Sequence, residues 1–126
     1  SNLLAESSCA YNLMHCVSSY PCDVASSNMP RLNWLKQLHT GVGLSDHTQS
    51  TLTPALAVAM GATVIEKHFT SDNELEGRDN KFALNPQKFK EMVDLIHEAY
   101  TSMEYLGNNY QDSEADTVKN YRGRWG

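Results

Sequence analysis

Three pairs of polar side chains stand at or just after the ends of short apolar runs, and the members of each pair are two positions apart. The pairs are Ser18 and Tyr20, Ser45 and His47, and Glu66 and His68. Side chains alternate in direction along a strand, so we expect the two members of each pair to face the same side. Imidazoles, hydroxyls and a carboxylate gathered on one side can bind a divalent cation and a polar substrate. The spacing therefore predicts a polar site at one end of a sheet.

His47 and His68 are the candidate metal ligands. If their strands are neighbours, about 4.8 Å apart, both imidazoles can reach one cation, and the nearby Glu66 carboxylate suits a divalent ion such as Mn²⁺ with open positions. A closed zinc site is not indicated, because no third or fourth strong ligand is visible in the sequence. The alternative is that both histidines are hydrogen-bonded loop residues and that Glu66 pairs with a buried lysine or arginine.

Several neighbouring residues have simpler interpretations. By alternation Lys67 faces away from the predicted site, and we expect it to extend outward past the helices. Cys16 is expected to be a small core residue and His15 a structural residue on the opposite face. His39 and His97 fall on helical or loop patterns and are expected at the surface. In the first pair, Ser18 and Tyr20 can equally be turn residues before a proline.

The apolar runs that must position these residues alternate with helical patterns. The predicted order is strand 11–17, helix 30–38, strand 41–45, helix 54–60, strand 62–69 and a last helix that starts at Pro86 and ends before Gly107. Thr53 and Asn85 are the expected N-caps of the second and third helices. Alternation of strands and helices with short connections predicts an α/β fold with a parallel sheet.

Composition narrows the class of protein. The chain has 126 residues and a formal net charge of -5, with its carboxylates scattered and no basic stripe, which argues against nucleic-acid binding. No apolar stretch approaches the roughly 20 residues needed to cross a bilayer, and no signal-peptide pattern opens the chain. The three cysteines form an odd set without a CxxC pair. We expect a single soluble domain in the cytoplasm, with no membrane partner.

Several ordered motifs resemble the sialic acid synthase family, which includes N-acetylneuraminate synthase and its legionaminic and pseudaminic acid relatives. They are "LMHCVSSYP", "VGLSDHT", "GATVIEKHFT" and "GRDNKFAL", and the similarity spans roughly Leu13 to Leu106. The resemblance implies a TIM (β/α)₈ barrel, of which this chain would hold the last three strand-helix units within residues 11–106. Residues 107–126 would then be a polar linker or tail towards a C-terminal antifreeze-like domain that these 126 residues do not include.

The resemblance also implies a role for each residue that matches the family's motifs. Two histidines hold Mn²⁺ or Mg²⁺, serines contact phosphoenolpyruvate, and further groups contact the sugar or stand beside the metal. The matching residues are His47 and His68 for the metal, Ser18 and Ser45 for phosphoenolpyruvate, Tyr20 and Asp79 for the sugar, and Glu66 with Asp79 as catalytic carboxylates. The family often has "GPDH" where this chain has "GRDN", so Arg78 and Asn80 depart from the pattern.

The implied reaction condenses phosphoenolpyruvate with N-acetylmannosamine or a related N-acetylated hexosamine and releases phosphate. A complete barrel needs eight strands and about 250 residues, so we expect this chain to be inactive alone and to require the remaining strands or a partner copy in a homo-oligomer. The alternative is a noncatalytic remnant that binds a metal or a sugar and assembles through its exposed strand edges.

Overall fold

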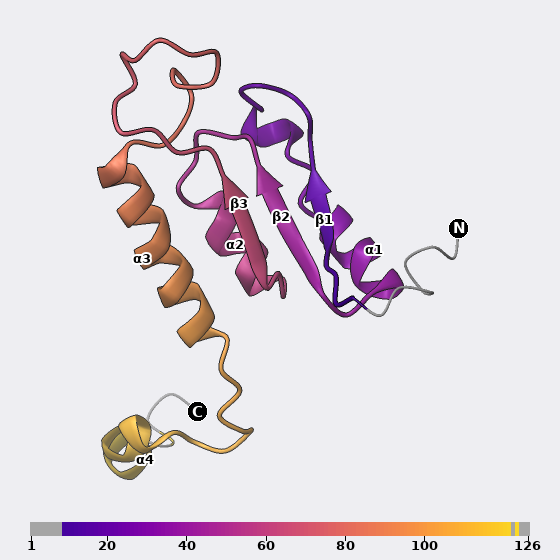
Figure 1. Cartoon of the computed structure of the whole chain (residues 1–126). Helices are drawn as coiled ribbons and strands as arrows, with labels where there is room; N and C mark the ends of the chain where they lie inside the picture. Colours follow the sequence, from indigo (N-terminus) through magenta and orange to yellow (C-terminus); the bar gives the residue numbers. More distant parts are fainter. Residues whose placement is uncertain (1–8, 122, 124–126) are drawn as a thin grey trace.

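Three parallel strands form the centre of the structure (Figure 1). A computed structural model describes residues 9–121 and residue 123 of the chain. The strands are β1 (Leu13–Cys16), β2 (Val42–Asp46) and β3 (Val64–Lys67), and they lie in the order β1-β2-β3. The predicted parallel sheet is confirmed. Strands β1 and β3 are shorter than predicted, and beyond β3 only a single bridge, between Phe69 and Leu84, continues the pairing.

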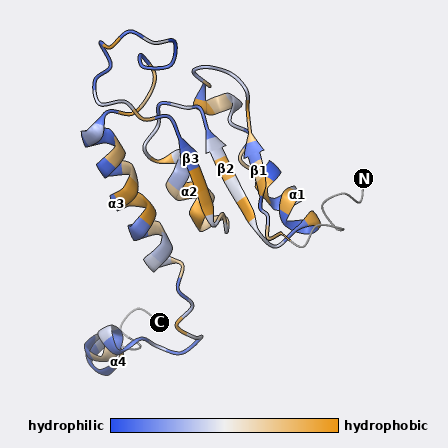
Figure 2. Ribbon diagram, in the orientation of Figure 1, coloured by the Kyte–Doolittle hydropathy of each residue, from blue (hydrophilic) through white to orange (hydrophobic). Residues whose placement is uncertain are grey.

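The helices follow the strands as the sequence predicts. Helix α1 (Arg31–Leu38) and helix α2 (Thr53–Ala59) pack on one face of the sheet, and α3 (Pro86–Ser102) packs on α2 (Figure 1). A 3₁₀ turn, η1 (Val24–Ser26), lies between β1 and α1. The apolar residues of α3 form bands along one side, whereas the loop after β3 is mainly hydrophilic (Figure 2). This is the pattern of a helix with one covered face.

The core lies between the sheet and its helices. Val42 and Leu44 of β2 contact Leu32 of α1 and Ala57 of α2 in one buried cluster. The strand register pairs Val42 with Leu13 and Leu44 with His15 on one side. On the other side it pairs Leu44 with Ile65 and Asp46 with Lys67. His15 is buried, and its Nε2 is 2.7 Å from the Ser27 carbonyl, so its predicted structural role is confirmed.

The alternate residues of the strands form the opposite face of the sheet. Cys16, Ser45 and Glu66 are register partners across the three strands, and Gly43 pairs with Met14 and Val64 one step below them. The Met14 thioether occupies the space that a side chain at position 43 would need, which explains the glycine. The polar residues of the predicted site therefore share one face, and the helices cover the other.

One predicted helix cap is confirmed and the other is wrong. The Asn85 side chain accepts a hydrogen bond from the backbone N–H of Lys88, as expected for the start of α3. Thr53 does not cap α2, because it is already the first residue of the helix. Ser50 takes that role instead, and its Oγ accepts from the backbone N–H groups of Leu52 and Thr53.

The expectation that the Lys67 side chain extends outward is wrong. Lys67 faces the helices, as alternation requires, but its side chain is only 3% exposed and so does not extend to solvent. The predicted tail 107–126 contains the 3₁₀ turn η2 (Asp112–Glu114) and helix α4 (Ala115–Tyr121). Their residues are polar and largely exposed, so no apolar period marked them in the sequence. Helix α3 ends at Ser102, somewhat before the predicted glycine.

Candidate functional site

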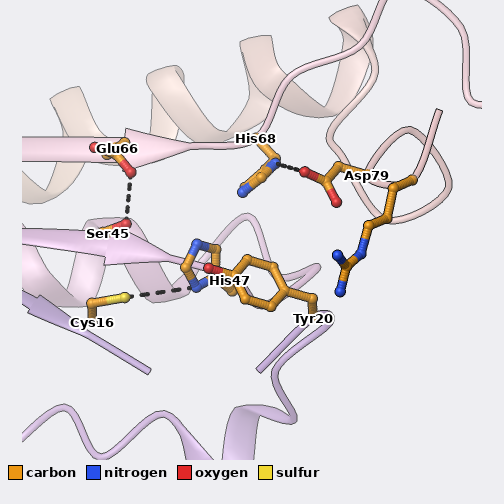
Figure 3. Close-up of a pocket in the computed structure, with 8 residues that line it drawn as sticks. Cys16, Tyr20, Ser45, His47, Glu66, His68 and Asp79 are labelled. Carbon is orange, nitrogen blue, oxygen red and sulfur yellow. Dashed lines mark hydrogen bonds and ion pairs between the residues drawn. The ribbon is translucent and has the colours of Figure 1, made fainter. Parts of the chain in front are cut away.

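A pocket of about 490 Å³ opens at the carboxyl ends of the three strands (Figure 3). This volume lies in the range of about 300–1,000 Å³ that is typical of small-molecule sites. The residues that line it are Cys16, Tyr20, Ser45, His47, Glu66, His68, Arg78 and Asp79. The structure thus brings together every proposed site residue except Ser18, which is exposed and lies outside the lining, with its Oγ 3.7 Å from the Cys16 Sγ.

His47 and His68 lie next to one another in this pocket, with ring centroids 5.2 Å apart (Figure 3). The Nδ1 of His47 is 2.9 Å from the Val17 carbonyl, so in the tautomer that donates to this oxygen the Nε2 keeps a lone pair for a ligand. The Tyr20 ring packs against the His47 ring at a centroid distance of 4.2 Å. Both contacts fix the orientation of the His47 imidazole.

His68 is held from the loop that follows β3. Its Nδ1 is 3.7 Å from Oδ2 of Asp79, which is too long for a hydrogen bond but close enough for attraction to a protonated ring. The Asn80 side chain donates to the carbonyls of Leu75 and Glu76 and so folds this loop. Asn80 therefore has a structural task in the motif "GRDN", whereas Arg78 of the same motif lines the pocket.

Glu66 lies beside the two histidines, on β3. Its Oε1 accepts a hydrogen bond from the Ser45 Oγ at 2.8 Å, across the β2–β3 register (Figure 3). Among the described residues no ion pair involves Glu66, so this part of the chain gives its carboxylate no lysine or arginine partner. The buried pair of the sheet is instead Lys67 with Asp46, at 2.6 Å.

Sequence reasoning missed three features of this region. Cys16 lines the pocket, with its Sγ 3.8 Å from the His47 Nδ1, and is not simply a core residue. Arg78 was noted only as a departure from the family motif. Asp46 went unremarked, although a carboxylate at the end of a strand whose other residues are apolar or small signals a buried partner.

The two imidazoles fit a pair of adjacent ligands of one cation. An imidazole nitrogen binds a first-row divalent ion at about 2.1 Å, which places the ring centroid roughly 3.3 Å from the ion. Two such ligands at roughly 90–110° would have centroids about 4.7–5.4 Å apart, and the observed separation is 5.2 Å. Within residues 9–121, no group of three or more His, Cys, Asp or Glu side chains is arranged to hold a metal. Further ligands would have to be water or substrate oxygens.

A parallel α/β fold with two histidines and a carboxylate at the strand ends is typical of an enzyme that acts on small oxygen-rich substrates. The sequence matches the NeuB family over residues 2–108, and the chain belongs to this family. A pseudaminic acid synthase of Campylobacter jejuni is 40% identical over 108 residues, which cover 85% of this chain and 31% of that protein. An N,N'-diacetyllegionaminic acid synthase of Legionella pneumophila is 43% identical over 90 residues, which cover 71% and 25%.

Solved structures show the same relationship. An N-acetylneuraminic acid (sialic acid) synthetase from Leptospira borgpetersenii, in complex with citrate, superposes with a TM-score of 0.75 at 33% identity and covers 86% of this chain and 38% of that one. The spore coat polysaccharide biosynthesis protein SpsE of Bacillus subtilis superposes with a TM-score of 0.69 at 32% identity, covering 87% and 35%. The chain thus spans between a quarter and a third of the length of the two synthases compared by sequence. None of the helices in the described part of the chain is long and apolar enough to span a membrane.

Proposed function

We propose that this chain forms part of the active site of a nonulosonate synthase, which condenses phosphoenolpyruvate with N-acetylmannosamine or a related N-acetylated sugar and releases phosphate. The observation that carries the proposal is the adjacent pair His47 and His68, with ring centroids 5.2 Å apart, beside Glu66 in one pocket. Membership of the NeuB family, and relatives named as pseudaminic and legionaminic acid synthases, support the class of product. Mn²⁺ or Mg²⁺ is the cation that we assign to the two imidazoles.

The reaction forms one carbon–carbon bond and breaks one carbon–oxygen bond. The methylene carbon of phosphoenolpyruvate bonds to the aldehyde carbon of the sugar, whose oxygen takes up a proton and becomes a hydroxyl. Water then adds to the neighbouring phosphoenolpyruvate carbon, the bond from that carbon to the phosphate oxygen breaks, and phosphate leaves a keto group behind. A divalent cation at the histidine pair supplies Lewis-acid polarisation of the aldehyde.

The side chains of this chain bind and orient the two substrates and accept protons. Ser45 and Ser18 are the contacts that we assign to phosphoenolpyruvate, and Tyr20 and Asp79 those to the sugar. Glu66, which accepts a hydrogen bond from the Ser45 hydroxyl, is the group that we assign to accept the proton of the attacking water. Holding both substrates in one geometry supplies a large part of the rate in a two-substrate reaction.

Mn²⁺ binding by the histidine pair tests the site. Electron paramagnetic resonance of free Mn²⁺ should show that replacing both His47 and His68 by alanine weakens binding by at least about tenfold, since both imidazole ligands are lost. The matched control is His97→Ala, because His97 lies exposed on α3, away from the pocket. Unchanged Mn²⁺ affinity in the double variant would remove the metal assignment and, with it, the main support for the proposed reaction.

A further inference from the structure

Lys67 is buried on the face of β3 opposite to Glu66 and His68. Its side chain is 3% exposed, and its Nζ donates to Asp46 Oδ2 at 2.6 Å, to the Thr48 carbonyl at 2.5 Å and to the Ser50 carbonyl at 3.0 Å. An ammonium group has three protons to donate. The Thr48 hydroxyl is a weaker acceptor, 3.4 Å from the same Nζ. All of these acceptors belong to the segment 46–50, which begins at the last residue of β2 and contains His47.

The Asp46 carboxylate also forms hydrogen bonds within the segment 46–50. Its Oδ1 accepts from the backbone N–H of Thr48 at 2.9 Å, and its Oδ2 accepts from the Thr48 hydroxyl at 3.0 Å. These bonds join the residues on either side of His47 across the helix-facing side of the sheet. The His47 ring itself projects into the pocket on the other side. Asp46 and Thr48, which flank His47, are thereby fixed on the helix side of the sheet, while the imidazole lies on the pocket side.

We propose that Asp46 and Lys67 are positioning residues, which fix the backbone on both sides of His47 and so aim its imidazole at the cation. The inference rests on the proposed function only in naming that cation. His47 is held from the β1 side by the Val17 carbonyl at its ring and by the Cys22 N–H at its own carbonyl. Lys67 supplies the corresponding hold from the β3 side, so the ligand is fixed between the two outer strands.

The chemistry of Lys67 argues for this role over simple stabilisation. A buried ion pair contributes little net stability compared with an apolar pair of the same size, whereas it fixes geometry through directed bonds. Two of the acceptors are backbone carbonyls of segment 46–50, and bonds to them constrain that backbone directly.

The first test needs no metal. In Lys67→Met, the side chain keeps its apolar bulk and loses its donors. We expect the His47 ring signals in NMR spectra to shift and broaden, and the amide of Thr48 to exchange with solvent at least about tenfold faster than in the unchanged chain. The control is Lys36→Met, because Lys36 Nζ also donates to a backbone carbonyl, that of Met60, but far from the site. His47 signals and Thr48 exchange that match the Lys36→Met variant would overturn the proposal.

Asp46→Asn provides the answer if Lys67→Met fails to fold. The amide keeps the shape of the carboxylate and an oxygen for the Thr48 N–H, but weakens the bond to Lys67. We expect a smaller shift of the His47 ring signals in the same direction as in Lys67→Met. A ring that is undisturbed in a folded Asp46→Asn chain counts against the positioning role.

The Mn²⁺ affinity of Lys67→Met is a second measurement. Its direction of change distinguishes the loss of positioning from the loss of a positive charge. Removal of the Lys67 ammonium leaves Asp46 negative and should by Coulomb attraction alone strengthen the binding of a cation. Loss of positioning instead predicts that the Mn²⁺ dissociation constant of Lys67→Met rises about tenfold, as when other supporting partners of a ligand are removed. Tighter or unchanged binding contradicts the proposal. If the unchanged chain binds no Mn²⁺, the proposed function fails, while the NMR comparison still decides whether Lys67 positions His47.

Discussion

The two faces of this sheet differ in how completely the chain covers them. On the face that meets the helices, Val42 is fully buried and Leu44 is 3% exposed. On the pocket face, Val64 is 39% exposed and Glu66 is exposed as well. The same strands carry both faces, and alternation assigns successive residues to one or the other. The helix-facing side has a core of its own, and the pocket side carries the chemistry with apolar surface left open.

The residues that stabilise the fold therefore lie on one face of the sheet, and those of the candidate site lie on the other. On the helix-facing side, Val42 and Leu44 pack into an apolar cluster formed within the described chain. The pocket residues lie close enough together to contact one substrate, and the three described strands form one wall of that site. Val64, at the start of β3 on the same face, is 39% exposed. The predictions below test this contrast.

The largest expected effect concerns turnover. We expect the isolated chain, supplied with phosphoenolpyruvate, N-acetylmannosamine and Mn²⁺, to release no phosphate above background, because one wall of a site cannot enclose both substrates. A phosphate-release assay measures this directly. In the control, the chain is mixed with the complementary part, a family member from which the segment that corresponds to this chain has been removed.

Robust turnover by a chain that is shown to be monomeric would contradict the view that the pocket face is incomplete while the helix-facing side is complete. Turnover that appears only with the complementary part would support that view. A chain that is inactive with every complement, and that self-associates through its strand edges, would favour the noncatalytic remnant. The mass of the chain in solution, with and without the complement, distinguishes these outcomes.

A matched pair of valines compares the faces energetically. Val42→Ala removes two methyl groups from a buried site and should lower the free energy of unfolding by about 2 kcal/mol. Val64→Ala makes the same change on the neighbouring strand, where the side chain is 39% exposed, and should cost about 0.5 kcal/mol. Equilibrium unfolding in urea, with unchanged dependence on denaturant, measures both values.

Equal costs for the two valines would mean that the pocket face is covered in solution, for example by self-association. A cost for Val64→Ala that rises when the complementary barrel segment is added would show that this segment packs on the exposed valine. Val42 lies on the central strand and Val64 on an edge strand, so the difference between the two costs includes strand position as well as burial.

Alternation along the strands could be predicted from the sequence, and it placed Glu66, His68, Ser45 and His47 correctly on one face. It still held for His47 and His68, each of which directly follows the end of its strand, but it failed farther from a strand end. Strand β1 stops at Cys16, so the spacing of later residues carries no facing information, and Ser18 lies outside the pocket. Tyr20 reaches the pocket from the loop beyond this strand, which periodicity alone cannot show.

Partners distant in the sequence were the second source of error. The face of Lys67 followed from alternation, but its burial depends on Asp46, which lies 21 positions earlier. A local pattern cannot reveal such a pair, although the two residues are register partners once the strands are aligned. The helix caps show the same limit. The sequence pattern predicted Thr53 as the N-cap of α2, whereas the side chain that accepts from the first backbone N–H groups is that of Ser50, three residues earlier.

The smallest expected effect compares two thiols. Cys16 lines the pocket, whereas Cys22 is 5% exposed. Burial, and then the nearby charges of Asp46 and Asp23, raise the pKa of the Cys22 thiol, so less of the reactive thiolate forms at pH 8. Iodoacetamide should therefore label Cys16 at least about tenfold faster than Cys22, as measured by mass spectrometry of the labelled peptides. The two rates should converge in urea, where both surroundings are lost, and equal rates in the folded chain would show that the region around Cys22 is as open as the pocket.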